Sequence, residues 1–154
     1  MSIGSLSRVL SCVIASATPL LVLAPAAVAQ PGSSYLCAGP YPARDGSANL
    51  DSCIYAEDGT VRAFGELEIK DGTIDKTNCV MSVRVIDKDA YKTGENEDVA
   101  NSGDFPCFNG RYPSPPLTMD IAKARPGHVY VTVTTVTKRG QDHFTPMYSP
   151  ELVL

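Results

Sequence analysis

Two histidines, His128 and His143, could act as acid–base catalysts, and serine and aspartate, which complete a hydrolase triad, are plentiful. A working triad needs a nucleophilic serine held against a histidine that a carboxylate orients. The chain has no Gly-x-Ser-x-Gly segment, which would present such a serine on a sharp turn. We therefore expect two ordinary surface histidines, no catalytic residue and no enzyme activity.

Five cysteines offer a second chemistry, either metal ligation or disulfide formation. Cys12 lies in an export leader described below, which leaves Cys37, Cys53, Cys79 and Cys107. They include no Cys-x-x-Cys pair, so we predict no zinc site. An even number of cysteines in an exported chain predicts two disulfides. Four cysteines allow three pairings, and we expect the one that joins neighbours, Cys37 with Cys53 and Cys79 with Cys107.

Residues 87–104 concentrate carboxylates, with six acidic side chains and no apolar periodicity. We interpret the stretch as a loop. Carboxylate oxygens bind calcium, and Asp87 and Asp89 begin the order of an EF-hand loop. Tyr91 then stands where Asp or Asn is needed, and Lys92 stands where Gly is needed. A solvated loop that keeps a sheet edge soluble is the alternative; we predict no metal ion and no cofactor, and calcium binding by the loop stays an open question.

Residues 107–116 could carry recognition chemistry, because an expected disulfide anchors one end and three prolines stiffen the other. A stiff segment loses little entropy on binding. It would serve as a rigid recognition loop, with Arg111 entering the main pocket of a protease, or as a plain connector between sheets. The candidate binding residues in it are Phe108, Asn109, Arg111 and Tyr112.

The amino-terminal segment 1–29 is typical of a signal peptide. Arg8 precedes an apolar stretch, and Ala27-Val28-Ala29 matches the small-x-small pattern that signal peptidase cleaves. Removal of residues 1–29 from the 154-residue chain leaves 125 residues. We expect these, residues 30–154, to form one secreted domain with no membrane span, in which 30–49 is an amino-terminal extension.

The charge balance excludes one class of partner. The net charge of the whole chain is −4, and loss of Arg8 with the leader makes it −5. Nucleic-acid binding needs a clustered basic surface, so we expect no nucleic-acid partner. An extracellular protein or a cell surface is the expected partner, and the oligomeric state is open.

Alternation of apolar and polar residues predicts strands along the whole secreted portion. The clearest run is Val61, Ala63, Leu67 and Ile69, which alternate with charged residues. No apolar pattern at helical spacing continues for three turns. About seven short strands indicate an antiparallel β-sandwich. The expected strands cover 50–57, 61–69, 79–85, 105–108, 117–121, 129–136 and 144–152.

One local motif narrows the fold class. Ala124, Pro126 and Tyr130, followed by a valine- and threonine-rich strand, resemble the tyrosine corner near the end of a fibronectin type III domain, with Ala124 in place of leucine. The resemblance implies an immunoglobulin-like sandwich in which the Tyr130 hydroxyl bonds back to the backbone of the preceding turn. It assigns Pro126 and Tyr130 structural roles. Thr132 and Thr134 depart from the family, which has apolar residues at these two positions.

The export segment, the cysteines and the strand pattern together predict a small secreted binding or structural module without enzyme activity. The alternative function is a secreted protease inhibitor that acts through residues 107–116.

Overall fold

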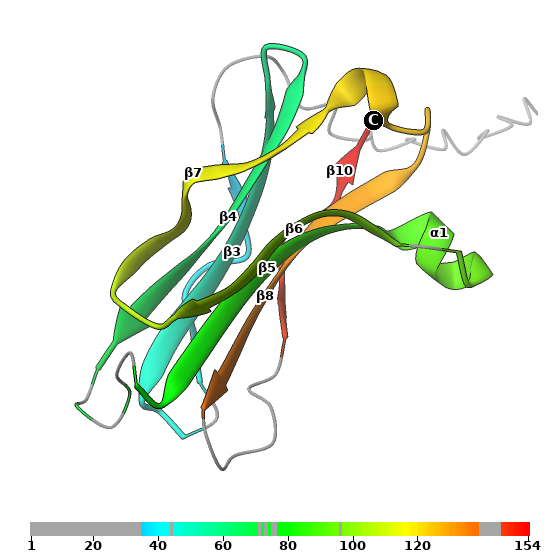
Figure 1. Cartoon of the computed structure of the whole chain (residues 1–154). Coiled ribbons are helices and arrows are strands. Elements are labelled where there is room, and N and C mark those ends of the chain that lie inside the picture. Colours follow the sequence, from blue (N-terminus) through cyan, green and yellow to red (C-terminus); the bar gives the residue numbers. More distant parts are fainter. Residues whose placement is uncertain are drawn as a thin grey trace, which may run out of the picture.

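The chain folds as two antiparallel β-sheets packed face to face, as seen in a computed structural model (Figure 1). The predicted all-β sandwich is therefore confirmed. The leader, residues 1–29, and His143 lie outside the described residues. The structure describes residues 35–43, 45–70, 72, 74, 77–95, 97–138 and 146–154.

The first sheet, sheet A, is centred on a long hairpin of β3 and β4. Their turn is Asp58-Gly59, with both residues at positive φ, 49° and 73°, as a tight hairpin turn requires. β1 and β2 pair with the outer edge of β3, and β7 pairs with the other side of β4. The strands of sheet A are β1 (Leu36–Cys37), β2 (Tyr41–Pro42), β3 (Ala48–Glu57), β4 (Thr60–Ile69) and β7 (Gly110–Asp120).

The second sheet, sheet B, has the order β10-β8-β5-β6, and β9 also pairs with β8. Helix α1 projects from the end of β5 (Figure 1), and a short 3-10 helix, η1, follows β7. These elements are β5 (Cys79–Asp87), α1 (Lys88–Thr93), β6 (Asp98–Pro106), η1 (Ile121–Lys123), β8 (Val129–Lys138), β9 (Met147–Tyr148) and β10 (Leu152–Val153).

The prediction that residues 87–104 form a loop is wrong, because they contain α1 and most of β6. Asp87 caps the helix by accepting hydrogen bonds from the backbone N–H groups of Asp89 and Ala90. The helix is too short to show an apolar period. β6 is an edge strand whose register against β5 shifts twice, and its sequence does not alternate apolar with polar residues although its side chains are alternately half-buried and exposed along most of the strand.

The interpretation of residues 107–116 as a loop is also wrong for most of that segment. β7 begins at Gly110, and the expected strand 105–108 is only the end of β6. The prolines fall where β7 leaves β4: the register passes from Tyr112 opposite Gly65 to Leu117 opposite Ala63. Proline is tolerated there because no ladder hydrogen bond is needed. The expected strand 144–152 is two short strands, β9 and β10, in its described part.

Both predicted disulfides are present. Cys37–Cys53 joins β1 to β3, with the two Cα atoms 4.2 Å apart, and the two cysteines are directly opposite in the strand register. Cys79–Cys107 joins the start of β5 to the residue after β6, with the Cα atoms 5.3 Å apart. Each bridge therefore fixes an edge strand to the strand beside it.

The middle of the sandwich is polar, although apolar clusters lie on either side of it. The Thr132 hydroxyl donates to the Cys53 carbonyl at 2.9 Å, and the Thr134 hydroxyl donates to the Ser52 hydroxyl at 3.0 Å. A methyl group at Gly65 would lie only 2.5 Å from the Thr134 hydroxyl oxygen. The two sheets therefore approach closely here and are joined by hydrogen bonds.

The hydrogen bond that the tyrosine motif predicts is present. The Arg125 backbone N–H donates to the Tyr130 hydroxyl at 2.8 Å, and Tyr130 is buried. The turn between them contains Pro126 and Gly127, whose φ is 78°. Tyr130 thus fixes the entry of the chain into β8.

Candidate binding groove

The outer face of sheet A carries a row of polar side chains. Strand alternation turns Leu50 and Leu67 into the core, and it turns their neighbours outward. Asp51 stands opposite Glu66 in the register of β3 and β4, and Asn49 stands opposite Glu68. Two cross-strand polar pairs therefore lie one above the other on this face.

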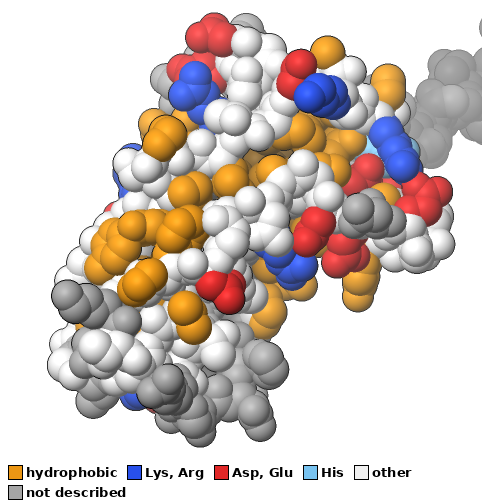
Figure 2. Space-filling view, viewed as in Figure 1, with side chains coloured by type: hydrophobic (Ala, Val, Ile, Leu, Met, Phe, Trp, Pro, Cys, Tyr) orange, Lys and Arg blue, Asp and Glu red, His pale blue; other side chains and the backbone are white. Residues whose placement is uncertain are grey.

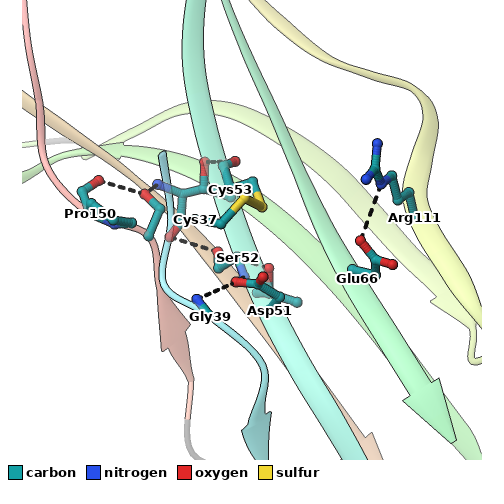
Figure 3. Close-up of a disulfide and its surroundings, with 11 residues drawn as sticks. Cys37, Gly39, Asp51, Ser52, Cys53, Glu66, Arg111 and Pro150 are labelled. Carbon is teal, nitrogen blue, oxygen red and sulfur yellow. Dashed lines mark hydrogen bonds and ion pairs between the residues drawn. A yellow bond between two sulfur atoms is a disulfide. The ribbon is translucent and has the colours of Figure 1, made fainter. Parts of the chain in front are cut away.

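These pairs line a groove of about 490 Å³. Pro40 lies on the side of β3, and Asn109 and Gly110 lie beyond β4, so the groove spans both central strands of sheet A. Figure 3 shows Asp51 joined to Gly39 beside the disulfide, and Glu66 facing Arg111 across β4 and β7. The residues that line the groove are Pro40, Asn49, Leu50, Asp51, Glu66, Leu67, Glu68, Asn109 and Gly110.

Each of the three groove carboxylates, those of Asp51, Glu66 and Glu68, accepts hydrogen bonds through only one of its two oxygens. Asp51 Oδ1 accepts from two backbone N–H groups, those of Gly39 at 3.0 Å and Ser52 at 2.7 Å. Glu66 Oε2 accepts from Arg111 Nε at 3.1 Å. Glu68 Oε2 accepts from the Asn49 amide at 2.7 Å. Within the described part of the chain, the second oxygen of each carboxylate has no hydrogen-bond partner.

Arg111 borders the groove and rests on an aromatic wall. Its guanidinium carbon lies 5.0 Å from the centre of the Phe64 ring and 5.6 Å from that of Tyr35. Tyr35 meets Phe64 edge-on at 5.4 Å and Tyr55 edge-on at 4.7 Å. These are cation–π and aromatic contacts. One guanidinium is thus held on this face by a carboxylate and two rings.

The four predicted binding residues separate into two places. Asn109 lines the groove, where its side-chain oxygen accepts from the Ile69 backbone N–H at 2.6 Å, and Arg111 lies beside it. Phe108 and Tyr112 instead meet edge-on with their ring centres 4.0 Å apart, and the ring centre of Phe105 lies 5.1 Å from that of Tyr112. Hydrophobic side chains gather over this junction of β6 and β7 (Figure 2). The segment therefore contributes to two surfaces.

Arg111 does not stand at the tip of a loop. It lies within β7, directly opposite Glu66 in the register of β4, and its guanidinium is ion-paired to that residue. A residue that enters a protease pocket has to project freely from a rigid loop. The geometry places Arg111 on a sheet face instead.

A second cluster of titratable groups, the corner cluster, consists of Asp87, Asp89 and His128 where α1 meets β8. Asp87 is almost fully buried, and its Oδ2 lies 2.8 Å from His128 Nδ1. Asp89 accepts from the Val129 backbone N–H at 3.0 Å and from Lys92 Nζ at 2.8 Å. Oxygen and nitrogen atoms of the three residues come within 4.8 Å of one another. All four carboxylate oxygens already have a partner.

The electrostatics of the corner cluster favour ionised carboxylates. Burial alone would raise the pKa of Asp87, but hydrogen bonds from the Ala90 backbone, His128 and the Asp89 backbone together hold that pKa below its ordinary value of 3.8. The hydrogen bonds from Lys92 and the Val129 backbone lower the pKa of Asp89. The cluster therefore ties α1 to the start of β8.

Two other acidic residues of 87–104 form ion pairs. Asp98 pairs with Arg84 at 3.2 Å, and Glu95 pairs with Arg125. The charges thus fix β6 and the loop after α1 to neighbouring elements.

Sequence reasoning missed the groove. Asp51 is far from Glu66 and Glu68 in the sequence, and Glu66 and Glu68 are two positions apart. Only the pairing of β3 with β4 brings the three residues together. The alternation of Glu66 and Glu68 with apolar residues did mark one face of that strand as polar. The alternation does not show which polar residues of the neighbouring strand stand opposite Glu66 and Glu68.

No helix within the described ranges is long and apolar enough to span a membrane. Comparison with protein-family models, with curated proteins and with solved structures finds no match to this chain.

Proposed function

We propose that the chain is an exported, non-enzymatic binding module that holds its partner in the groove on the outer face of sheet A. Two disulfides support export, because disulfides persist in oxidising compartments. The groove lies on strands that are paired on both sides, so its side chains are positioned by a rigid scaffold.

The observation that carries this proposal is that one oxygen of each groove carboxylate has no hydrogen-bond partner among the described residues. Each of Asp51, Glu66 and Glu68 is oriented by protein hydrogen bonds to one of its two oxygens, and the second oxygen has no hydrogen-bond partner among the described residues. An oriented acceptor that the protein does not itself use costs little entropy to engage. The groove is therefore preorganised for hydrogen-bond donors.

We also propose that the sandwich is immunoglobulin-like. The chain crosses between the sheets after β4, after β6 and again after β7, as Greek-key connections do. The Tyr130 hydrogen bond at the entry to β8 supports the same class. Neither feature depends on the groove.

The absence of enzyme activity is part of the proposal. The ring of His128 has Asp87 as its hydrogen-bond partner among the described residues, and no hydroxyl or thiol group shares that contact. A histidine that activates a nucleophile has to hydrogen-bond to it. His128 is better explained as a hydrogen-bond partner of the buried Asp87 carboxylate.

The alternative, a protease inhibitor acting through residues 107–116, has weaker support because Arg111 is paired within the sheet. Incubation of the oxidised protein with a trypsin-like protease tests it directly. Stoichiometric inhibition that disappears in Arg111→Ala would favour the inhibitor over the groove module.

A capture experiment with matched variants tests the proposed function. The oxidised protein is immobilised and exposed to the medium in which its source grows, alongside Glu66→Gln/Glu68→Gln. Glutamine keeps an oxygen that accepts from Arg111 and Asn49 but removes the charge. Glu97→Gln/Asp104→Asn removes the same charge from β6 and the residue before it, and serves as the control.

We expect a partner that the wild type and the control retain and the groove variant loses. Retention by all three proteins would show that the groove is not the binding site.

A further inference from the structure

We infer that the Cys37–Cys53 disulfide is a redox-sensitive clasp on the outer face of sheet A. Its reduction lets residues 35–40, the strap, detach from β3 and uncovers two aromatic side chains beneath them. The strap includes β1 and ends before β2. The reductant is a protein with two neighbouring thiols, such as a disulfide oxidoreductase. This step does not require a ligand in the groove.

The strap covers apolar side chains that face away from the core. Ala63 packs in the core, so alternation along β4 turns Phe64 to the outer face. Phe64 is nevertheless only 2% exposed, and Tyr55, which packs with it, is 7% exposed. Tyr35 meets both rings edge-on, and Cys37 packs against the same cluster. Two aromatic side chains on an outer face therefore owe part of their burial to the strap.

Apart from the disulfide, few contacts hold the strap. β1 is only two residues long, and Leu36 within it is partly buried against the core. The Ala38 backbone N–H donates to the Ser52 carbonyl at 3.1 Å, and the Gly39 N–H donates to Asp51 Oδ1 at 3.0 Å. Strands are usually longer than this, and segments with so few contacts open locally at low free-energy cost. The disulfide is thus the main restraint on the strap.

The other end of the strap has a hinge and an anchor. Gly39 has a φ of 94°, in the left-handed region that favours glycine. Beyond it, β2 pairs with β3, and Ala43 is buried in a core cluster. Opening should therefore stop near Gly39 and leave the rest of sheet A in place.

The two disulfides differ in access. Cys37 is half-buried at the edge of sheet A, although Cys53 is buried. Cys79 and Cys107 are 4% and 1% exposed and pack in a core cluster. Thiol–disulfide exchange needs a thiolate to reach one of the sulfur atoms. A reductant should therefore reach the first bridge through Cys37 and should not reach the second while the fold is intact.

The exchange balances as two successive displacements. A thiolate of the reductant attacks Cys37 Sγ, the bond to Cys53 Sγ breaks, and Cys53 leaves as a thiolate that takes up a proton. The second thiolate of the reductant then displaces Cys37, which also takes up a proton. Two electrons and two protons pass to the clasp, and the two thiols of the reductant become a disulfide.

Timed reduction of the full-length oxidised protein with dithiothreitol tests the access of the two bridges. Samples are stopped with N-ethylmaleimide, and peptide mass analysis measures the label on each cysteine. We expect Cys37 and Cys53 to be labelled about tenfold faster than Cys79 and Cys107. Equal rates, or faster labelling of the second pair, would overturn the inference.

Amide hydrogen exchange tests the opening of the strap. We expect the amides of Ala38 and Gly39 to exchange about tenfold faster once the first bridge is reduced. Cys37→Ser/Cys53→Ser, which lacks the bridge, should show the same increase without reductant. The Cys107 N–H, which donates to the Cys79 carbonyl beside the second bridge, is the control and should not change. Strap amides that keep their rates in both samples would overturn the inference.

Hydroxyl-radical labelling of the serine variant tests whether the rings are uncovered. Labelling of Tyr55 and Phe64 should rise about threefold over that in the oxidised wild type, while labelling of the buried Tyr130 should stay constant. Circular dichroism should show unchanged β-sheet content. Unchanged labelling of the two rings, or loss of the β-sheet signal when this bridge alone is absent, would overturn the inference, because the bridge would then hold the whole fold.

Discussion

The groove and the corner cluster both gather carboxylates, yet they use them in opposite ways. At the corner, Asp87 and Asp89 accept hydrogen bonds from three backbone N–H groups and two side chains, and no oxygen is left open. In the groove, each carboxylate keeps one oxygen without a partner in the described structure. A buried carboxylate has to be fully paired to be tolerated, whereas one on an open face need not be.

The difference teaches which acidic residues stabilise the fold and which are available to a ligand. Sequence alone marks the stretch containing Asp87 and Asp89 as the acidic centre of the protein. The structure shows that those two side chains join α1 to β8, and that the residues left for binding lie on β3 and β4. Changes at the two places should therefore separate stability from binding.

The largest expected effect is that of Asp87→Ala at the corner. It removes the helix cap and leaves His128 without its partner, which should lower the free energy of unfolding by about 2–3 kcal/mol. The corresponding fall in melting temperature is about 10 °C. Thermal melting monitored by circular dichroism measures it. Asp104→Ala, on an exposed part of β6, is the control, and an equal loss in both variants would contradict the role of Asp87.

Acidification should remove the stabilisation of the fold that Asp87 provides. The pKa of Asp87 in the folded protein is below 3.8, so its ionised form stabilises the fold above pH 4, and this stabilisation is lost as the pH falls through the lowered pKa. The difference in unfolding free energy between the wild type and Asp87→Asn should shrink as the pH is lowered from about 5 to below about 4. Urea unfolding across this range measures it; a difference that grows on acidification would refute the assignment.

Neutralising the groove should leave the fold intact. Glu66→Gln/Glu68→Gln keeps the acceptors for Arg111 and Asn49, and exposed ion pairs contribute little. We expect the free energy of unfolding to change by less than about 0.5 kcal/mol. Urea unfolding beside the wild type checks this. A loss comparable to that of Asp87→Ala would mean that the groove, too, is structural.

Calcium should have the smallest effect. The corner cluster has no free oxygen, and the groove carboxylates do not converge on one point. Millimolar calcium should shift the melting temperature by less than about 1 °C, because only a ligand that binds the folded state stabilises it. A rise of several degrees that Asp89→Asn abolishes would identify a calcium site at the corner.

The fold was predictable where a local pattern reflects the packing. β4 alternates apolar and charged residues because one face is buried, and Asp58-Gly59 marks its hairpin with β3. The disulfide pairing followed from joining neighbours in the chain. Tyr130 was recognisable because its hydrogen bond is local, spanning five residues to Arg125.

The rest depended on contacts that no local pattern records. β6 and β7 are edge strands with irregular register, so prolines and polar residues stand where buried strands would be apolar. The candidate site was only partly predictable: Asn109 and Arg111 were singled out within a stiff segment, but they contribute to a groove rather than to a loop. Asp51 and Glu66 meet only because β3 pairs with β4 in one register.

A titration of ¹⁵N-labelled protein with the partner recovered in the capture experiment, followed by amide chemical shifts, compares the two regions in a single sample. The shifts should concentrate in residues 49–51, 66–68 and 109–110, and the amides of Asp89, Ala90 and Val129 at the corner should not move. Shifts at the corner, or at the junction around Phe105 and Tyr112, without shifts in the groove would contradict the assignment of the groove as the binding site.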